Sequence, residues 1–522
     1  MEEESNTNQS IKKRKNKAKK LLFSWVEDNY DKLLIAVFIL AVILRIYFFW
    51  ITKNQAVWWD AADYLTQAKV IAGKINIEYI FNPRRPFLLA VLWGFMFKIG
   101  LGEISLRVTE VIFSIAAIPA MYFLGKVMFN KKVGLISAFL LAVFWQHLFF
   151  TNRLMTEMPS LLFLISAMYF FWQGYVKKHK PMKNMIWFGI FMGLALLTRG
   201  GSLLIGPPLA LFILTTDKLK FLKNKHLWMS LLIIFLIMSP FFLFIYIQQG
   251  GNPVSKYLGF AQGRYTTSKA MGLPGLLTYT GFMPEYFGWA LLIPFLLGIL
   301  ILLADIGLNL DIIIKNNNLY LKKLLLLFFW IAFPLLFLSI VNDHFEPRYI
   351  LFVFPAFFIV LSNGLIKLET WAKKYHKHLG LILIIIILGL GGYYQINRAN
   401  ESITPKINSY KELKLAGEWL KQNTNKDDTI ITKSVSQITY YSERQTYPMS
   451  MNKTEFEQDI ENLNPDYLVL SIFENHAPWM FQYPNQNTSN LVPVKAYQQQ
   501  EQPVLVIYRF NNNNTQFNQY IL

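Results

Sequence analysis

Long apolar stretches alternate with short polar connections along most of the chain. Eleven stretches of about 15–22 residues have the length expected of α-helices that cross a hydrocarbon core of about 30 Å. A further apolar stretch, 86–101, is ambiguous, because hydropathy does not decide whether it crosses. The pattern predicts a polytopic α-helical membrane protein. The predicted spans are 33–51, 107–126, 133–150, 157–174, 185–199, 202–215, 226–247, 287–304, 323–341, 348–366 and 379–396.

The composition agrees with this prediction and excludes a soluble enzyme. Of the 522 residues, 54% are hydrophobic and only 16% are charged, whereas a soluble domain carries about 25% charged residues. The chain has no cysteine, which excludes disulfides, thiolate catalysis and cysteine-based metal sites. The net charge of +19 resides mostly in lysines of the short connections. It therefore indicates membrane topology, with membrane lipids and not nucleic acid as the partner.

These lysine clusters also predict how the chain is threaded. If 86–101 lies along the membrane or re-enters it, every lysine cluster faces the cytoplasm. If 86–101 crosses the membrane, all clusters after the first face outward, which goes against the positive-inside tendency. The sequence thus predicts eleven spans, a cytoplasmic N-terminus and an extracytoplasmic segment after residue 398. We find no cleavable signal peptide and expect 33–51 to be a retained anchor. The clusters lie at 12–20, 126–132, 177–183, 218–225, 315–323 and 367–377.

The composition changes near residue 399, which suggests a second domain. Asn, Gln, Lys and Asp become frequent there and long apolar runs end. We expect helices at 409–423 and 453–463 and strands at 429–432, 467–471 and 504–510, hence a small extracytoplasmic α/β domain. The predicted organisation is a basic cytoplasmic tail (1–32), a transmembrane catalytic domain (33–398, with outer loops 52–106 and 248–286) and the C-terminal domain (399–522).

The arginines are distributed unevenly between the two sides of the predicted topology. Arg14 alone is cytoplasmic, and the other arginines lie at or near the outer face or in the C-terminal domain. A guanidinium group matches a phosphate with two parallel hydrogen bonds, so the distribution indicates an anionic group that is bound on the outer side. Snorkelling of single arginines to lipid headgroups is the alternative, and the sequence leaves it open.

The first candidate cluster follows the first span, where Asp60 and Asp63 come directly after Trp58 and Trp59. Two carboxylates three residues apart share one face of a short helix. Beside apolar surface at headgroup level, either could have a raised pKa and act as a general base. The alternative is an interfacial tryptophan belt followed by an aspartate at a helix start.

Three further clusters bring charged groups to the same level. Arg84 and Arg85 precede the ambiguous stretch and could hold a lipid phosphate or simply contact bulk lipid. Glu157 begins a span, and a structural pair with Arg153 is the alternative to a functional role. One predicted span ends near residue 341 and the next begins near residue 348, and the connection between them is unusually rich in ionisable groups. Arg199 lies at the same outer face of the membrane. That connection contains Asp343, His344, Glu346, Arg348 and Tyr349.

In the order of these features the chain resembles the GT-C superfamily of membrane glycosyltransferases, most of all the protein O-mannosyltransferase and aminoarabinose-transferase type (glycosyltransferase family 39-like). The resemblance covers roughly 33–366 and includes the segment 346–351 with Pro355. Ala61 stands where the family has a second acid, and Asp63 is a possible substitute. The other matching residues are Arg45, Asp60, Tyr64, Ala68, Arg84, Arg85, Pro86, Arg153 and Glu157.

The resemblance implies a GT-C fold and an inverting transfer of a sugar from a polyprenyl-phosphate donor to a glycan, protein or lipid acceptor at the outer face. Asp60 would be the general base. It also implies that no metal cofactor is required, although the sequence itself does not decide whether a divalent cation bridges Asp60 and Glu157. Asp63, Tyr64, Glu157 and Glu346 would position the sugar or the acceptor. The donor phosphate would bind Arg84, Arg85, Arg199, His344, Arg348 and Tyr349.

Two other classes of protein compete with this hypothesis. A transporter or flippase of a lipid-linked anion would show paired repeats with broken helices and charges near the bilayer centre, and neither is evident in the sequence. A receptor with an outer sensor domain would not explain the acidic loop after the first span.

Overall fold

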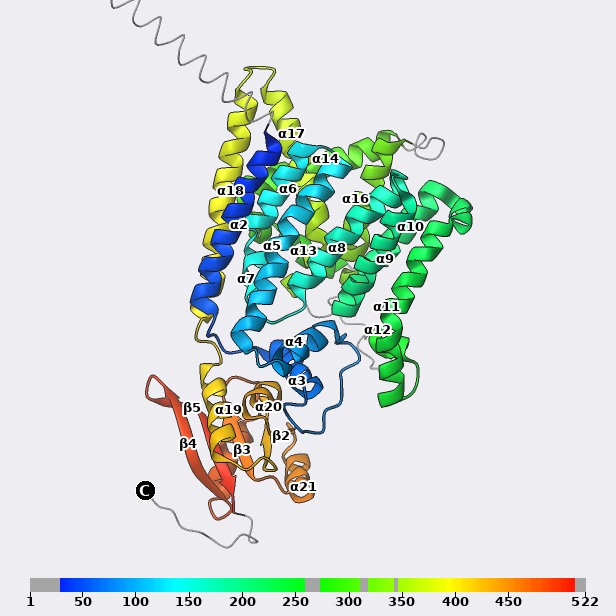
Figure 1. Ribbon diagram of the computed structural model, residues 1–522. Helices are drawn as coiled ribbons and strands as arrows, with labels where there is room; N and C mark the ends of the chain where they lie inside the picture. Colours follow the sequence, from blue (N-terminus) through cyan, green and yellow to red (C-terminus); the bar gives the residue numbers. More distant parts are fainter. Residues whose placement is uncertain (1–28, 259–272, 310–317, 342–345, 512–522) are drawn as a thin grey trace, which may run out of the picture.

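The computed structural model describes residues 29–258, 273–309, 318–341 and 346–511. Its long helices form a bundle, and a small sheet lies beyond one end of the bundle (Figure 1). Within the described residues, 10 helices are long and apolar enough to cross a membrane. They are built from α2 (Tyr30–Thr52), α5 (Glu103–Met128), α8 (Glu157–Phe171) with η1 (Trp172–Val176), α9 (Pro181–Thr198), α10 (Gly206–Asp217) with η2 (Gly200–Ile205) and η3 (Lys218–Lys223), α11 (Lys225–Gln249), α14 (Met283–Leu308), α16 (Leu319–Val341), α17 (Phe354–Ala372) with η5 (Pro347–Val353), and α18 (Leu379–Ile403) with η6 (Thr404–Lys406).

A further pair of apolar helices is bent. The helices α6 (Lys131–Val143) and α7 (Trp145–Thr151) meet at an angle of 54°, and counting them as one span gives up to 11 crossings. The ambiguous stretch forms only α4 (Leu88–Lys98), whose 11 residues reach about 16 Å and are too short to cross. It lies at the end of the bundle beside α3 (Trp59–Ile71) (Figure 1). The short helices α12 (Pro253–Leu258) and α13 (Leu273–Gly281) belong to the predicted loop 248–286.

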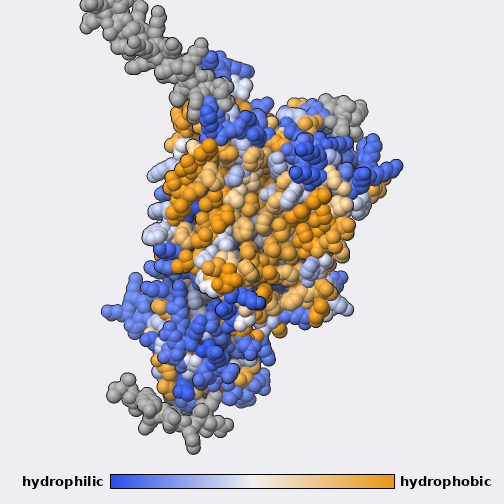
Figure 2. Space-filling view, viewed as in Figure 1, coloured by the Kyte–Doolittle hydropathy of each residue, from blue (hydrophilic) through white to orange (hydrophobic). Residues whose placement is uncertain are grey.

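The surface of the bundle carries a broad apolar belt between two polar ends (Figure 2). The lysine-rich connections that follow α8, α10 and α17 lie at one end, whereas α3, α4 and the C-terminal sheet lie at the other (Figure 1). The positions of the lysine clusters in the sequence predict that these connections and α3 lie at opposite ends of the bundle. Which end faces the cytoplasm stays a prediction.

Two glycines let α14 and α17 approach closely. A Cβ atom at Gly364 would meet the carbonyl oxygen of Pro294 and lie 3.0 Å from the backbone nitrogen of Gly298. Backbone atoms cannot move aside as a flexible side chain can. The crossing of these helices therefore requires glycine, which has no Cβ atom, at positions 298 and 364.

The substitution Gly364→Ala is expected to lower the free energy of unfolding by about 1–3 kcal/mol, because the added methyl overpacks this crossing. Thermal unfolding in detergent, followed by circular dichroism, measures the effect. The matched control is Gly389→Ala in α18, since no atom of the described chain lies within 4 Å of a Cβ at that position. Equal melting temperatures for the two variants would contradict the prediction.

The C-terminal segment folds into a five-stranded sheet with the strand order β2-β1-β3-β5-β4. The strands β2, β1 and β3 are parallel, and β5 is antiparallel to β3 and to β4. Apolar side chains of β1 and β3 pack into two small cores on the two faces of the sheet. The elements are α19 (Lys411–Asn423), β1 (Thr429–Thr432), α20 (Val435–Ser442), β2 (Gln445–Pro448), α21 (Lys453–Leu463), β3 (Tyr467–Ser471), α22 (Pro478–Gln486), β4 (Leu491–Gln499) and β5 (Gln502–Phe510).

The five expected elements of this segment are present, and β2, β4, α20 and α22 come in addition. The two strands that the sequence does not reveal, β2 and β4, are the two edges of the sheet. Edge strands are half solvated and tolerate proline, so they lack the apolar run that marks a central strand.

The helix α3 lies between the bundle and the C-terminal domain, and both contact it. The backbone nitrogen of Val57, just before α3, donates a hydrogen bond of 2.8 Å to the Tyr441 hydroxyl. Further along α3, Lys69 forms an ion pair of 2.8 Å with Glu443. Both partners belong to α20 or follow it directly, so the C-terminal domain fixes the position of the helix that carries Asp60.

Candidate active site

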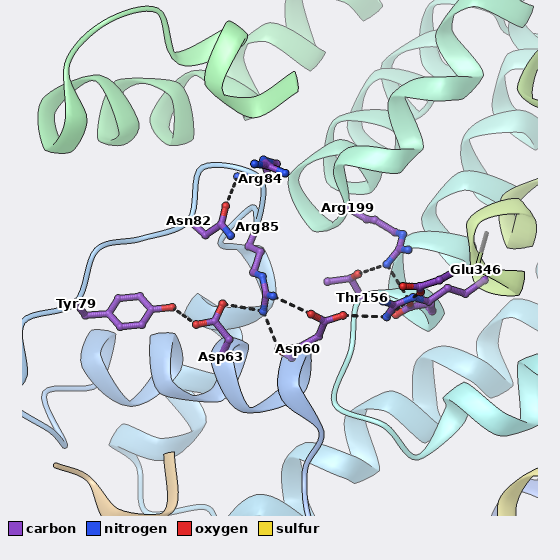
Figure 3. Close-up of polar contacts among 11 residues, drawn as sticks. Asp60, Asp63, Tyr79, Asn82, Arg84, Arg85, Thr156, Arg199 and Glu346 are labelled. Atoms are coloured by element: carbon purple, nitrogen blue, oxygen red, sulfur yellow. Dashed lines mark hydrogen bonds and ion pairs between the residues drawn. The ribbon is translucent and has the colours of Figure 1, made fainter. Parts of the chain in front are cut away.

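The first turns of α3 place Asp60 and Asp63 on one face, as their spacing predicts. Arg85 bridges them, with 2.8 Å from Nη2 to Oδ1 of Asp60 and 2.7 Å from Nη1 to Oδ2 of Asp63. The other oxygen of Asp63 accepts a hydrogen bond of 2.7 Å from the Tyr79 hydroxyl. The guanidinium of Arg85 also lies over the ring of Tyr64, 5.2 Å from its centroid. One arginine thus orders the acidic face of the helix (Figure 3).

A second arginine joins Asp60 to the bundle. Nη1 of Arg348, in η5, lies 3.0 Å from Oδ2 of Asp60 and 3.6 Å from Oε1 of Glu157 at the start of α8. Its Nε forms an ion pair with Glu346. Segments that are almost 300 residues apart in sequence (60 to 348) therefore meet at a single guanidinium group.

A third arginine completes the cluster. Nη1 of Arg199, which follows α9, lies 2.8 Å from Oε1 of Glu157 and 2.9 Å from the hydroxyl of Thr156. The Glu157 side chain is only 1% exposed, so its charge requires these partners. The alternative pair of Glu157 with Arg153 is wrong, because the Arg153 guanidinium lies over the ring of Trp58, 3.5 Å from its centroid.

Beside Asp60 and Arg348 lies a cavity of about 550 Å³, which we call the catalytic cavity. Its volume is within the range of about 300–1,000 Å³ that is usual for small-molecule sites. Its walls combine several aromatic rings with three cationic groups. The lining includes Trp58, Trp59, Trp145, Phe149, Phe150, Tyr410, Arg348, Arg398 and Lys406.

Comparison with known proteins identifies the fold. Residues 84–244 match the profile of the dolichyl-phosphate-mannose-protein mannosyltransferase family. The fold matches ArnT from Cupriavidus metallidurans bound to undecaprenyl phosphate, with a TM-score of 0.62 and 14% identity over 92% of this chain and 98% of that chain. The chain therefore has the GT-C fold of membrane glycosyltransferases.

Other GT-C structures have the same fold. The oligosaccharyltransferase of Archaeoglobus fulgidus in its apo form matches with a TM-score of 0.64 and 15% identity over 85% of this chain and 70% of that chain. The oligosaccharyltransferase AglB from Archaeoglobus fulgidus, in complex with an inhibitory peptide and a dolichol-phosphate, matches with a TM-score of 0.60 and 16% identity over 95% of this chain and 76% of that chain. By sequence alone, no curated protein matches the chain. The predicted GT-C fold is therefore confirmed, and the family match over 84–244 supports the predicted glycosyltransferase class.

In the structure, the pKa of Asp60 differs from the sequence-based expectation. Burial raises the pKa of this carboxyl, but the positive charges of Arg85 and Arg348 outweigh that effect and lower it below its ordinary value. The expectation of a raised pKa is therefore wrong for Asp60. It considered the apolar surroundings of α3 and did not include arginines that only the tertiary structure brings near. Asp60 is ionised at neutral pH, as a proton acceptor must be.

Replacing Arg85 with glutamine is expected to move the acid limb of activity to higher pH. The lowered pKa keeps Asp60 ionised as the pH falls. Removing one of the positive charges that lower this pKa raises it, so activity is lost at a higher pH. The ratio kcat/KM should be measured against pH, because it reports the free enzyme. Arg84→Gln is the control, since the side chain of Arg84 points away from Asp60 (Figure 3). An unchanged acid limb in Arg85→Gln would contradict the prediction.

The other predicted site residues fall into three groups. Tyr349 hydrogen-bonds to Glu346, and Tyr64 lies beneath Arg85, so both contact the arginine–carboxylate cluster. Arg84 lies in the same loop as Arg85 but on the side away from the carboxylates (Figure 3). His344 and its neighbour Asp343 lie outside the described residues.

Sequence reasoning missed Tyr79 and Arg398. Tyr79 contacts Asp63 across 16 positions, and Arg398 lines the catalytic cavity from the far end of α18. No local pattern distinguishes either residue from an ordinary interfacial residue.

The position between Asp60 and Glu157, where the sequence left a bridging cation open, is occupied by the Arg348 guanidinium. Within the described residues, no group of three or more His, Asp or Glu side chains is arranged to hold a metal ion. The carboxylates of the cluster are thus compensated by protein cations.

Proposed function

We propose that the protein transfers a sugar from a polyprenyl-phosphate donor to an acceptor at the outer membrane face, with inversion at the anomeric carbon. The observation that carries the proposal is the contact of Arg348 with both Asp60 and Glu157 beside the catalytic cavity. A carboxylate and cationic groups therefore surround one space, as the proposed proton acceptor and phosphate ligands require. That space lies at the end of the apolar belt, where a lipid-linked substrate presents its headgroup.

The cluster supports phosphate binding because its arginines still have unused donors. Within the described residues, no hydrogen-bond partner is found for Nη2 of Arg348 or for Nε and Nη2 of Arg199. A phosphate at this position would receive charge-assisted hydrogen bonds from both guanidinium groups. The similar fold of ArnT bound to undecaprenyl phosphate and of AglB with dolichol-phosphate supports a lipid-phosphate donor.

The chemistry follows from the position of Asp60. Its carboxylate takes the proton of an acceptor hydroxyl as the hydroxyl oxygen forms a bond to the anomeric carbon. The bond from that carbon to the phosphate oxygen breaks, and the phosphate leaves with the electron pair, which Arg348 and Arg199 stabilise. Attack from the side opposite the phosphate inverts the configuration.

Donor binding would also strengthen the base. In the structure, Arg348 contacts Asp60, and this contact lowers the pKa of the carboxyl. A phosphate that draws Arg348 toward itself weakens the contact, so the pKa of Asp60 rises toward its ordinary value and the carboxylate becomes a better proton acceptor.

The remaining cluster residues would then have positioning roles. Asp63 and Tyr64 hold Arg85, whereas Glu157 and Glu346 hold Arg348. These contacts fix the guanidinium groups before the substrate arrives, which is how preorganised charge contributes to catalysis.

The decisive experiment measures release of polyprenyl phosphate by purified protein in lipid nanodiscs. Polyprenyl-phosphate-linked hexoses and pentoses are supplied with a detergent extract of cell-envelope glycans and proteins, and the products are followed by mass spectrometry. Turnover of at least one donor is expected, and NMR of the product should show an inverted anomeric configuration. A protein that translocates the lipid across vesicles without releasing polyprenyl phosphate would contradict the proposal and support a flippase.

Orientation can be tested separately because the natural chain has no cysteine. Single-cysteine variants Lys183→Cys, in the first turn of α9, and Glu457→Cys, in α21, are treated in intact cells with a membrane-impermeant maleimide. Labelling of Glu457→Cys alone is expected, and labelling of Lys183→Cys alone would reverse the proposed topology.

A further inference from the structure

The indole of Trp59 lines two cavities. One is the catalytic cavity, and the other is a second cavity of about 370 Å³ between α3 and the C-terminal domain. We call this second cavity the C-terminal crevice. Trp59 precedes Asp60 in the chain, so the crevice adjoins the proposed base. Besides Trp59, the crevice is lined by Lys433, Pro448, Met451, Glu474 and Asn475, among others.

The C-terminal crevice lies where a parallel sheet usually binds ligands. Lys433 directly follows β1, Pro448 is the last residue of β2, and Glu474 lies shortly after β3. These three strands are adjacent and parallel, so their carboxyl ends meet at one edge. In open α/β sheets, ligands bind in the crevice outside that edge. The position of the cavity in the domain is therefore that of a binding site.

The side chains of the C-terminal crevice combine a flat aromatic surface with polar groups of both kinds. Trp59 is 36% exposed, and its Nε1 donates a hydrogen bond of 2.5 Å to Oε1 of Glu474, which fixes the orientation of the ring. The same carboxylate accepts a hydrogen bond of 3.3 Å from the Ser434 hydroxyl. Lys433 and Asn475 supply an ammonium and an amide to the same space.

We propose that the C-terminal crevice binds a carbohydrate, namely the glycan acceptor of the proposed transfer reaction, and this inference rests on that proposed function. A sugar ring presents an apolar C–H face that packs on an aromatic ring. Its hydroxyl groups both donate and accept hydrogen bonds. The Glu474 carboxylate can accept from them, and the Lys433 ammonium and the Asn475 amide can donate to them. A glycan held there would extend past Trp59, so that its terminal hydroxyl reaches Asp60.

The rigid placement of α3 supports this arrangement. The contacts of Val57 with Tyr441 and of Lys69 with Glu443 fix α3 to the C-terminal domain before and after Trp59. The crevice and the catalytic carboxylate therefore keep one relative position. A bound acceptor is oriented without any further movement of the domain.

The test uses the full-length protein in lipid nanodiscs on an array of mono- to pentasaccharides, with an array of Ser/Thr-containing peptides as the second arm. Wild-type protein is expected to bind a set of glycans. Lys433→Ala and Asn475→Ala should each weaken this binding at least tenfold while the melting temperature stays unchanged. The matched control is Lys495→Ala. Lys495 lies in β4, an outer strand of the sheet that does not line the crevice, so this variant should bind glycans as the wild type does.

Three results would overturn the inference. They are absence of glycan binding, glycan binding that both crevice variants retain, and binding of peptides instead of glycans that the two variants abolish. Release of polyprenyl phosphate, measured in parallel, separates this inference from the proposed function. Release without glycan binding refutes only the crevice, whereas glycan binding without release from any donor refutes the transfer reaction and with it the acceptor role.

Discussion

The substitution Asp60→Asn is expected to lower kcat for sugar transfer by about 10²–10⁴-fold, the usual contribution of a positioned general base. The amide keeps the shape of the carboxyl but cannot accept the proton of the attacking hydroxyl. The fold should survive, because each arginine that loses Asp60 keeps another carboxylate. Arg85 still contacts Asp63, and Arg348 still contacts Glu157 and Glu346. Release of polyprenyl phosphate measures the effect, and thermal unfolding checks the fold.

The matched control for this prediction is Asp63→Asn. Asp63 lies on the same face of α3 and binds the same arginine as Asp60, but it does not line the catalytic cavity. We expect a smaller loss of activity, because Arg85 keeps its contact with Asp60. A larger loss in Asp63→Asn than in Asp60→Asn would assign the base to Asp63 instead.

The substitution Arg348→Met is expected to abolish transfer and also to destabilise the protein. Removing one partner of a buried ion pair typically costs about 3–5 kcal/mol, because the remaining charge stays buried without its counterion. Arg348 is itself partly exposed, and Glu157 keeps Arg199, so we expect the lower end of that range, about 3 kcal/mol. Denaturant unfolding of the detergent-solubilised protein measures the loss of stability.

Two further variants separate stability from catalysis at this position. In Arg348→Met combined with Glu157→Gln, the buried carboxylate is neutral, so much of the stability should return while transfer stays absent. Arg348→Lys keeps a charge but loses the planar fork that reaches three carboxylates, so intermediate activity is expected. Wild-type stability in Arg348→Met would show that the ion pairs of Arg348 do not hold the cluster together.

The sequence by itself determined the features that depend on short segments of chain. Each span is a run of apolar residues long enough to cross the hydrocarbon core, and the lysine clusters at one end follow from the positions of lysine between those runs. The short stretch 86–101 does not cross, as the clusters predict. The central strands β1, β3 and β5 were also predictable, because buried strands carry continuous apolar side chains. The shared face of Asp60 and Asp63 needs only the helical repeat.

Only the tertiary structure decided how these segments meet. The partners of Glu157 are Arg199 and Arg348 and not the nearby Arg153, because α8, α9 and η5 converge while the Arg153 side chain packs on Trp58. The direction of the pKa shift of Asp60 was decided in the same way, since it depends on the distances to two guanidinium groups from other parts of the chain. Trp59 shows the same limit. Its sequence position suggests an interfacial belt, and only the docking of the C-terminal domain on α3 makes it line a second cavity besides the catalytic one. The charge and the packing at this site depend on segments that are far apart in the sequence, so no short sequence pattern predicts them.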